Sequence, residues 1–378
     1  GSSMPAPGTS AAPHAHSSEE IKKHVNIPVA TVARINEPWM AEELIANGKC
    51  DMCMIGRPNL CDSEFANKAF EGKVDDIRPC IGCGRCLTGI MMGKRIGCTV
   101  NPSVEDDTIA PAETKKKVLV IGGGPAGMEA AYVAKKRGHE VVLCEKSNEL
   151  GGQLRLAAVP IAKQELCKVI KFMIRRLDHE GIEIRLNTEV TKERLENEFK
   201  DYEIVCSSGA TPKEIPPFKV FKNWMTADDV LSGKKYPGRN IVVLGGGSVG
   251  CETADYLAPL INDLFPMNRK ITLLEMTNNL MPGEGGAAKS RLTQRLMQKG
   301  VRIELNAQVT NVDEESITYV KEGVEHKITE ADTLIFAVGY APKKVEVEAE
   351  NVHYIGDCEK VGTLKDAITN AHEIAKNI

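Results

Sequence analysis

The chain has 378 residues, of which 42% are hydrophobic and 26% charged, and its formal net charge is −4. Because acidic and basic residues are mixed along it, this composition does not favour binding to nucleic acid or to an anionic membrane surface. No apolar run reaches the roughly 20 residues that a membrane span needs, and the first residues lack the basic and apolar regions of a signal peptide. Together with the twelve cysteines, these features predict a soluble, cytoplasmic redox protein of two or three domains.

The first part of the chain has the pattern of a β/α fold. Residues 27–33 are apolar enough for a buried parallel strand, residues 38–47 suit a helix, and residues 50–55 suit the next strand. Each strand ends in a pair that offers backbone N–H groups and a guanidinium, which would suit a phosphate at the carboxyl end of a β/α barrel. These residues are Ala33, Arg34, Gly56 and Arg57. Two surface arginines at turns would explain them equally well.

Four cysteines follow in the segment PCIGCGRCLTGIMMGKRIGCTVNP, residues 79–102. Cys80, Cys83 and Cys86 form two consecutive C-x2-C steps, and Cys98 comes after eleven further residues. The first three thiolates would lie round one small loop and the fourth would complete the set, which is how cysteines hold an iron–sulfur cluster. A structural zinc site is the alternative, although such a site usually pairs its cysteines as C-x2-C twice. We predict a 4Fe–4S cluster.

An apolar strand at residues 117–121 leads directly into the sequence GGGPAG and then into a helix that ends near residue 137. This is the G-x-G-x-x-G motif of dinucleotide-binding folds, with a strand before it and a helix after it. Gly122 would make the tight turn, Gly124 would let the pyrophosphate approach, and Gly127 would pack the helix on the strand. Glu145, at the end of the next strand, is expected to accept a hydrogen bond from a ribose hydroxyl.

The same unit recurs later in the chain, where a strand at residues 240–244 precedes GGGSVG and the next strand ends at Glu275. Its motif glycines are Gly245, Gly247 and Gly250. Two such folds predict two bound dinucleotides, normally FAD first and a nicotinamide second, whereas a decayed structural copy is the alternative. Glu275 would repel a 2′-phosphate and no arginine follows it closely, so we predict NADH rather than NADPH.

Other turns and strand ends would contact the cofactors. Gly152 and Gln153 form a turn that would lie against the flavin, and two strands end at the glycine turns of Gly209 and Gly339. Asp357 ends a late strand, where it would bond the ribityl chain or pyrophosphate of a flavin. A meander of alternating strands is expected at residues 302–305, 316–319 and 326–329.

These residues together resemble the multidomain NADH:flavin oxidoreductases related to old yellow enzyme. That family includes 2,4-dienoyl-CoA reductase, the enoate reductases, the bile-acid reductases and trimethylamine dehydrogenase. The resemblance covers residues 21–378, and its most specific parts are IPVATVARINEP, MIGRPNL, the cysteine segment and the two GGGxxG units. It implies an α/β protein that contains a partial β/α barrel remnant, an iron–sulfur loop and two Rossmann-like domains of the disulfide-reductase type.

The resemblance also implies segments and ligands. The segments are 1–77 for the end of an FMN-binding barrel, 78–114 for the cluster and linker, 115–225 and 339–378 for the FAD domain, and 226–338 for the NAD(H) domain. FMN would contact Ala33, Arg34, Gly56 and Arg57. FAD would be lined by Ala126, Glu145, Gln153, Val190 and Asp357. The cluster would be held by Cys80, Cys83, Cys86 and Cys98.

The implied activity is electron transfer from NADH through FAD and the 4Fe–4S cluster to FMN, which reduces an activated C=C bond of an enoate, enoyl-CoA or steroid-like substrate. The spacing of the second and third cysteines instead matches trimethylamine dehydrogenase, so an amine oxidoreductase stays open. Only about two of the eight barrel strands are present and no catalytic acid can be named. A subunit that feeds electrons to an FMN-bearing barrel partner is therefore another alternative, as is a homo-oligomer. A thiol–disulfide reductase is disfavoured because residues 151–167 contain only Cys167.

Overall fold

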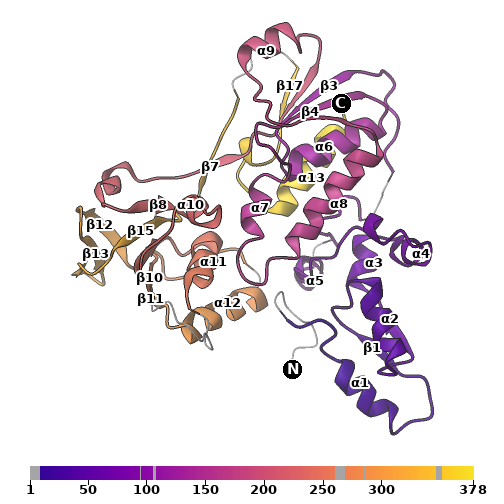
Figure 1. Cartoon of the computed structure of the whole chain (residues 1–378), viewed down its shortest axis with the longest axis horizontal. Coiled ribbons are helices and arrows are strands. Elements are labelled where there is room, and N and C mark those ends of the chain that lie inside the picture. The colour runs from indigo at the N-terminus through magenta and orange to yellow at the C-terminus, as the bar shows by residue number, and fades with distance from the viewer. Residues whose placement is uncertain (1–8, 94, 105–107, 260–268, 285, 346–350) are drawn as a thin grey trace. The chain divides into compact units, whose positions relative to one another are not determined.

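The computed structural model describes residues 9–93, 95–104, 108–259, 269–284, 286–345 and 351–378. It divides into two compact units (Figure 1). The first unit consists of residues 1–155, 165–209 and 342–378, and the second of residues 156–164 and 210–341. The boundary that the sequence suggested at residue 225 falls inside a strand, β8 (Trp224–Thr226), which belongs to the sheet of the second unit.

The first unit is built on a five-stranded parallel sheet with the strand order β17-β6-β3-β4-β5. Its strands are β3 (Lys117–Ile121), β4 (Glu140–Cys144), β5 (Glu183–Arg185), β6 (Glu203–Cys206) and β17 (Val352–Tyr354). The apolar runs of β3 and β4 are buried after their first residue, as expected for strands covered on both faces. The prediction of a strand, a glycine loop and a helix at this point is confirmed.

Helices cover this sheet, and three of them lie side by side in Figure 1. They are α6 (Pro125–Lys136), α8 (Leu166–His179) and α13 (Leu364–Ala375), and α6 packs against both others. The short helix α9 (Lys192–Asn197) packs on the sheet through a hydrophobic cluster. This cluster contains Leu195 of the helix, Val190 before it, and Leu119 and Ile121 of β3. The shorter helical turns of this part are α7 (Gln153–Ala157) and η3 (Gly356–Cys358).

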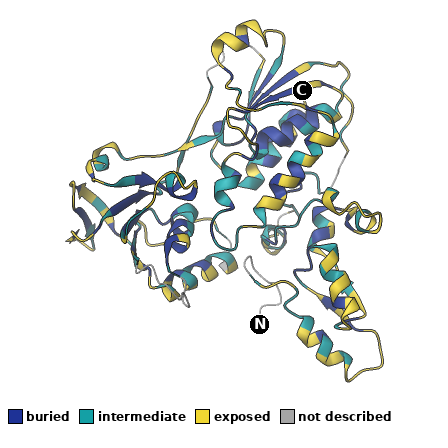
Figure 2. Cartoon of the chain, in the orientation of Figure 1, coloured by how far each residue is buried: buried dark blue, intermediate teal, exposed yellow. Residues whose placement is uncertain are grey.

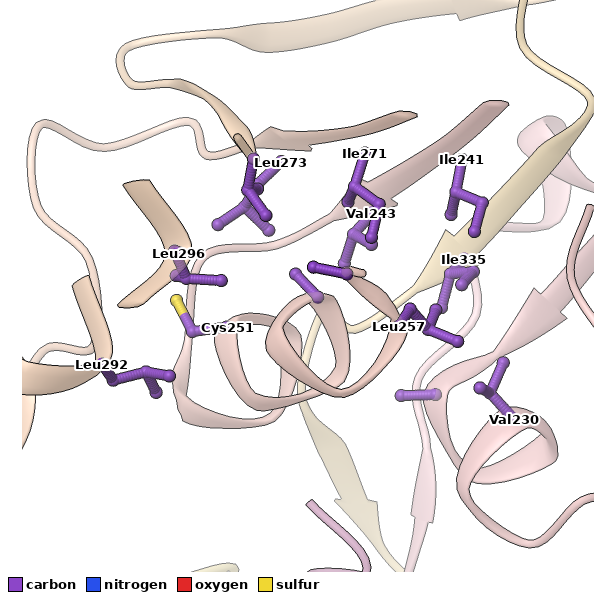
Figure 3. Packing of buried hydrophobic residues seen from close by; sticks show 14 of the residues in the cluster. Val230, Ile241, Val243, Cys251, Leu257, Ile271, Leu273, Leu292, Leu296 and Ile335 are labelled. Atoms are coloured by element: carbon purple, nitrogen blue, oxygen red, sulfur yellow. The ribbon is translucent and has the colours of Figure 1, made fainter. Parts of the chain in front are cut away.

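The second unit repeats this plan with the strand order β11-β10-β9-β15-β8, again parallel throughout. The further strands are β9 (Asn240–Leu244), β10 (Lys270–Leu274), β11 (Arg302–Glu304) and β15 (Thr333–Phe336), and the helices are α10 (Ala227–Leu231), α11 (Ser248–Leu257) and α12 (Gly286–Gln298). Figure 3 shows Val243, Ile271 and Ile335 of the sheet meeting Leu257 of α11, a contact that buries one face of the sheet.

An antiparallel sheet, β12-β13-β14, covers the other face of the second sheet through Val312, Ile317, Tyr319 and Ile328. Its strands are β12 (Gln308–Val312), β13 (Ile317–Lys321) and β14 (Val324–Ile328). The expected meander is confirmed for its last two strands, but its first was wrong, because residues 302–304 pair with β10 in the parallel sheet. The unit also contains β7 (Ala210–Pro212), which pairs with β16 (Tyr340–Pro342), and η2 (Pro216–Val220).

The N-terminal segment contains one small parallel pair, β1 (Ala30–Val32) with β2 (Met52–Met54). Its helices are α1 (Ala15–Lys22), α2 (Pro38–Ala46), α3 (Arg57–Cys61), α4 (Phe65–Phe70) and α5 (Arg85–Met91), together with η1 (Val74–Asp76). The expectation of a buried strand at 27–33 was wrong: the strand is shorter, and Val32, Met52 and Met54 are exposed. Figure 2 shows many exposed residues in this N-terminal segment. Helix α2 covers only one face of this pair, where Cys53 meets Ala41.

Candidate functional site

The loop after β3 has the geometry that a dinucleotide site needs. Gly122 has a φ of +104°, and a Cβ there would lie 2.5 Å from the carbonyl oxygen of Ser207. A Cβ on Gly127 would lie 1.9 Å from the carbonyl oxygen of Gly122, so only glycine lets α6 approach β3 this closely. At Gly124, by contrast, a Cβ would meet no described atom within 4 Å. The loop therefore leaves open space where a pyrophosphate would approach.

Glu145 at the end of β4 holds this loop through its carboxylate. Oε2 accepts a hydrogen bond from the N–H of Gly123 at 2.6 Å, and Oε1 accepts one from the N–H of Ser147 at 2.8 Å. The side chain is buried, with 7% of the residue exposed. The carboxylate is thus fixed beside the loop, in a place from which it could accept a ribose hydroxyl. That role stays a prediction.

The structure brings three of the other residues expected at FAD to the same loop: Gly152, Ala126 and Asp357. A Cβ on Gly152 would lie 3.1 Å from the Cα of Gly124, so this turn lies directly against the loop. A Cβ on Gly356 would lie 2.8 Å from the Cβ of Ala126, which places Asp357 next to the start of α6. Asp357 accepts a hydrogen bond from the N–H of Gly362, and burial raises the pKa of its carboxyl.

Three further residues from the expected FAD site have less direct places. Gln153 begins α7, directly after the turn. Val190 is buried in the cluster that contains Ile121. Gly209 follows β6 with a φ of +76°, and a Cβ there would meet no described atom within 4 Å. Their contact with a cofactor stays a prediction.

The loop after β9 in the second unit has nearly the same backbone geometry as the loop after β3. Gly245 has a φ of +110°, and a Cβ on Gly250 would lie 1.9 Å from its carbonyl oxygen, while the space beside Gly247 is open. Glu275 accepts hydrogen bonds from the N–H of Gly246 at 2.6 Å and the N–H of Thr277 at 2.8 Å. A structural repeat that binds no cofactor would not need open space beside Gly247. The geometry of this loop therefore favours the binding of a second dinucleotide over a purely structural role.

Sequence reasoning missed an ion pair beside this second loop. Lys163 Nζ lies 2.6 Å from Glu252 Oε1 on α11. Glu252 is largely buried, and burial raises the pKa of its carboxyl although Lys163 opposes that shift. The sequence feature that could have drawn attention to Glu252 is its position two residues after Gly250, the last glycine of the motif. Gly339, which was expected near the cofactor, follows β15 with a φ of +96°.

The four predicted cysteines line one cavity, together with Arg57, Leu60, Ile81, Gly84, Thr99 and Val100. Left-handed turns at Gly82 (φ +61°) and Gly84 (φ +74°) wrap the chain round this cavity before α5 begins. Burial raises the pKa of Cys80 to about 12, whereas contact with the Cys61 thiol lowers the pKa of Cys98 to about 6.

This donor set fits a polynuclear cluster better than a single ion. Among the described residues, no three His, Cys, Asp or Glu side chains converge closely enough to hold one metal ion. A cluster instead needs four sulfurs spread round a cavity, because its irons lie at the corners of a larger group. Four thiols with no other metal-binding side chain among the cavity-lining residues match that requirement.

The arginines expected at FMN both face the cysteine segment. Arg34 is buried, its Nη2 lies 2.5 Å from Glu165 Oε1, and a Cβ on Gly82 would lie 2.8 Å from its Nη1. Arg57 lines the cysteine cavity. Ala33 and Arg34 have φ values of 85° and 48°, which are strained for residues other than glycine. Gly56 begins α3, and contact of these four residues with FMN stays a prediction.

Residues 116–359 match the family model described as pyridine nucleotide-disulphide oxidoreductase. The chain therefore belongs to this family.

The chain is 34% identical over 372 residues to cinnamate reductase of Clostridium sporogenes, which covers 95% of the chain and 54% of that relative. It is 33% identical over 377 residues to bilirubin reductase of Mediterraneibacter gnavus, with 95% and 56% covered. The structure of a 2-naphthoyl-CoA reductase complex superimposes with a TM-score of 0.91 at 27% identity, over 100% of the chain and 58% of that structure. The chain thus spans about half the length of the curated relatives it matches.

These relatives confirm the predicted resemblance to the ene-reductase family and the prediction of an oxidoreductase. A histamine dehydrogenase from Rhizobium sp. 4-9, with a TM-score of 0.86 at 20% identity, shares the fold. In the described part of the chain, none of the helices combines the length and apolar character that crossing a bilayer demands.

Proposed function

We propose that the chain takes electrons from NADH and passes them through FAD and a 4Fe–4S cluster to FMN, for reduction of an activated C=C bond. The observation that carries this proposal is one chain with two open dinucleotide loops and a cavity lined by four cysteines. Relatives named cinnamate reductase and 2-naphthoyl-CoA reductase support the class of substrate, an alkene conjugated to a carbonyl or an aromatic acyl group.

Each part of the route has residues suited to it. Gly124 and Gly247 leave room for the two pyrophosphates, and helices α6 and α11 direct their N-terminal N–H groups to the same places. Glu145 and Glu275 would accept hydrogen bonds from ribose hydroxyls. With FAD, a nicotinamide and the cluster bound, the chain would accept an electron pair and release it in single-electron steps.

The Lys163–Glu252 pair would help to place the nicotinamide ring. Glu252 lies on α11, the helix that follows the open loop, and its side chain is largely buried, whereas Lys163 comes from residues 156–164 of the same unit and is partly exposed. Separating the partners would leave the carboxylate of Glu252 without its counter-charge. The pair would therefore keep a defined position beside a ring bound at this loop.

A second candidate function is an electron-transfer unit that supplies an FMN-bearing partner. The β1–β2 pair has one apolar face exposed, at Val32, Met52 and Met54. A complete barrel would continue such a sheet on both edges. In this reading Arg34 and Arg57 would complete a phosphate site only once the partner's strands are present. An amine oxidoreductase is a further alternative with the same electron route. Its substrate site would differ and would lie in the part of the relatives that this chain does not cover.

Anaerobic reconstitution of the whole chain tests the core of the proposal. We expect about four irons per chain, a broad absorption band that dithionite bleaches, and stoichiometric FAD. Cys83→Ala should lose the iron and keep FAD, because the residues expected at FAD lie beyond residue 120. Cys251→Ala, which alters a fully buried cysteine of the second unit, should keep both. Stoichiometric zinc without iron in the anaerobically purified wild type would contradict the proposal.

A further inference from the structure

One side chain outside the cysteine set lies against one of its sulfurs. Thr99 Oγ1 is 3.2 Å from Cys83 Sγ, and Thr99 is buried, with 6% of the residue exposed. Thr99 does not belong to the C-x2-C pattern, so it has no place in the ligand set.

Metal binding would fix the direction of this hydrogen bond. In the free chain, either the thiol or the hydroxyl could donate between Thr99 and Cys83. A cysteine that ligates iron has lost its proton, so its sulfur can only accept. The Thr99 hydroxyl would then have to donate to Cys83.

We propose that Thr99 is a positioning residue that raises the reduction potential of the cluster by donating a hydrogen bond to the sulfur of Cys83. This inference rests on the proposed 4Fe–4S cluster. The reduced cluster carries one more negative charge, shared with its sulfur ligands, so a donor stabilises the reduced form more than the oxidised form. Because Thr99 is buried, water cannot readily replace its hydroxyl as a donor if the side chain is changed.

The experiment measures the midpoint potential of the cluster by reductive titration followed by electron paramagnetic resonance, on the reconstituted whole chain. Thr99→Val removes the hydroxyl and keeps the shape of the side chain. This change should lower the midpoint potential while the iron content stays at the wild-type level. Thr99→Ser keeps a hydroxyl and should restore the wild-type potential. Thr253→Val, which removes a fully buried hydroxyl in the second unit, should leave the potential unchanged.

The possible failures are separable. If Thr99→Val keeps the wild-type iron content and the wild-type potential, the tuning role is wrong and the proposed cluster stands. If Thr99→Val loses iron, Thr99 is needed to hold the cluster, which also contradicts a role through a hydrogen bond alone. If the wild-type chain itself takes up no iron, the proposed function fails, and this inference fails with it.

Discussion

Glu145 and Glu275 are held in the same way in the two units. In each case one carboxylate oxygen accepts the N–H of the middle glycine of the loop, and the other accepts an N–H two residues further along the chain. Each loop therefore holds a carboxylate in a fixed orientation where the adenosine ribose is expected.

From this fixed carboxylate we predict a preference for NADH over NADPH at the second loop. A 2′-phosphate would meet the carboxylate of Glu275, whereas a ribose hydroxyl would donate to it. The difference should be about 1–3 kcal/mol, or roughly 5- to 150-fold in kcat/KM. The measurement is the ratio of kcat/KM for the two nucleotides with ferricyanide as acceptor, and Glu275→Ala should reduce it. Equal values in the wild type would show that Glu275 does not face the ribose.

Residue roles could be predicted from sequence where one motif imposes one geometry. The strand, glycine loop and helix fix the places of Gly122, Gly127 and Glu145, because the close approach at Gly127 allows only glycine. Lys163 lies far from Glu252 in sequence, and no local sequence pattern predicts that the two form an ion pair. The same holds for Arg34, whose partner Glu165 comes from a distant helix.

At the scale of elements, a buried charge network joins the three helices α6, α8 and α13. Glu129 of α6 lies 2.5 Å from Arg176 of α8 and 3.0 Å from Nδ1 of His372 of α13. Arg176 also stacks over the rings of Tyr132 and Phe172. Burial opposes ionisation of Glu129, but Arg176 and His372 outweigh it and lower its pKa to about 2.

This network predicts acid sensitivity of the first unit. Because the pKa of Glu129 is lowered from 4.5 to about 2, its contribution to stability is complete above pH 4.5 and is lost as the pH falls toward 2. Glu129→Gln should cost about 3–5 kcal/mol at neutral pH, since it leaves Arg176 buried without a counter-charge. Urea unfolding at pH 7 measures this cost.

Two results would check the interpretation. Glu180→Gln breaks the more exposed Lys136–Glu180 pair between the same helices α6 and α8 and should cost at most about 1 kcal/mol. The loss of stability on acidification should be smaller in Glu129→Gln than in the wild type. Equal costs for the two variants would mean that the network does not join the helices as described.

Strand positions were predicted well in the sheet centres and poorly at the edges. The central strands β3 and β9 are continuous apolar runs, and their expected bounds agree with the structure. Residues 302–304 lie at a sheet edge, where only one face is covered, so their alternating pattern looks like that of an antiparallel strand. The sequence QVTNV of β12 is too polar to predict a strand by itself. It forms one because it pairs with β13.

At the scale of the whole molecule, the N-terminal segment is the least complete part. Its two strands have an exposed apolar face, and Trp39 of α2 is also exposed. Both features are typical of a surface that packs against further chain. The two dinucleotide-binding units, by contrast, each have a full five-stranded sheet with its own hydrophobic clusters.

We therefore predict that the purified 378-residue chain carries FAD but substoichiometric FMN. It should oxidise NADH with ferricyanide or a dye, because that reaction needs only the two dinucleotide sites. It should reduce no enoate or enoyl-CoA at a measurable rate, since two strands cannot enclose an isoalloxazine ring. Flavin analysis after denaturation and an assay for alkene reduction check both points. Steady alkene reduction by this chain alone would contradict the prediction.

The division of the first unit into three stretches of sequence has a consequence for synthesis on the ribosome. Strand β17 and helix α13, which complete the first sheet and pack on α6, are translated after all of residues 210–341. Domains tend to fold as units once their residues have emerged. The second unit can therefore reach its native state while the first unit still lacks Asp357 and α13. The order of folding would thus reverse the order of the two units along the nascent chain, and the dinucleotide site of the first unit would be completed last.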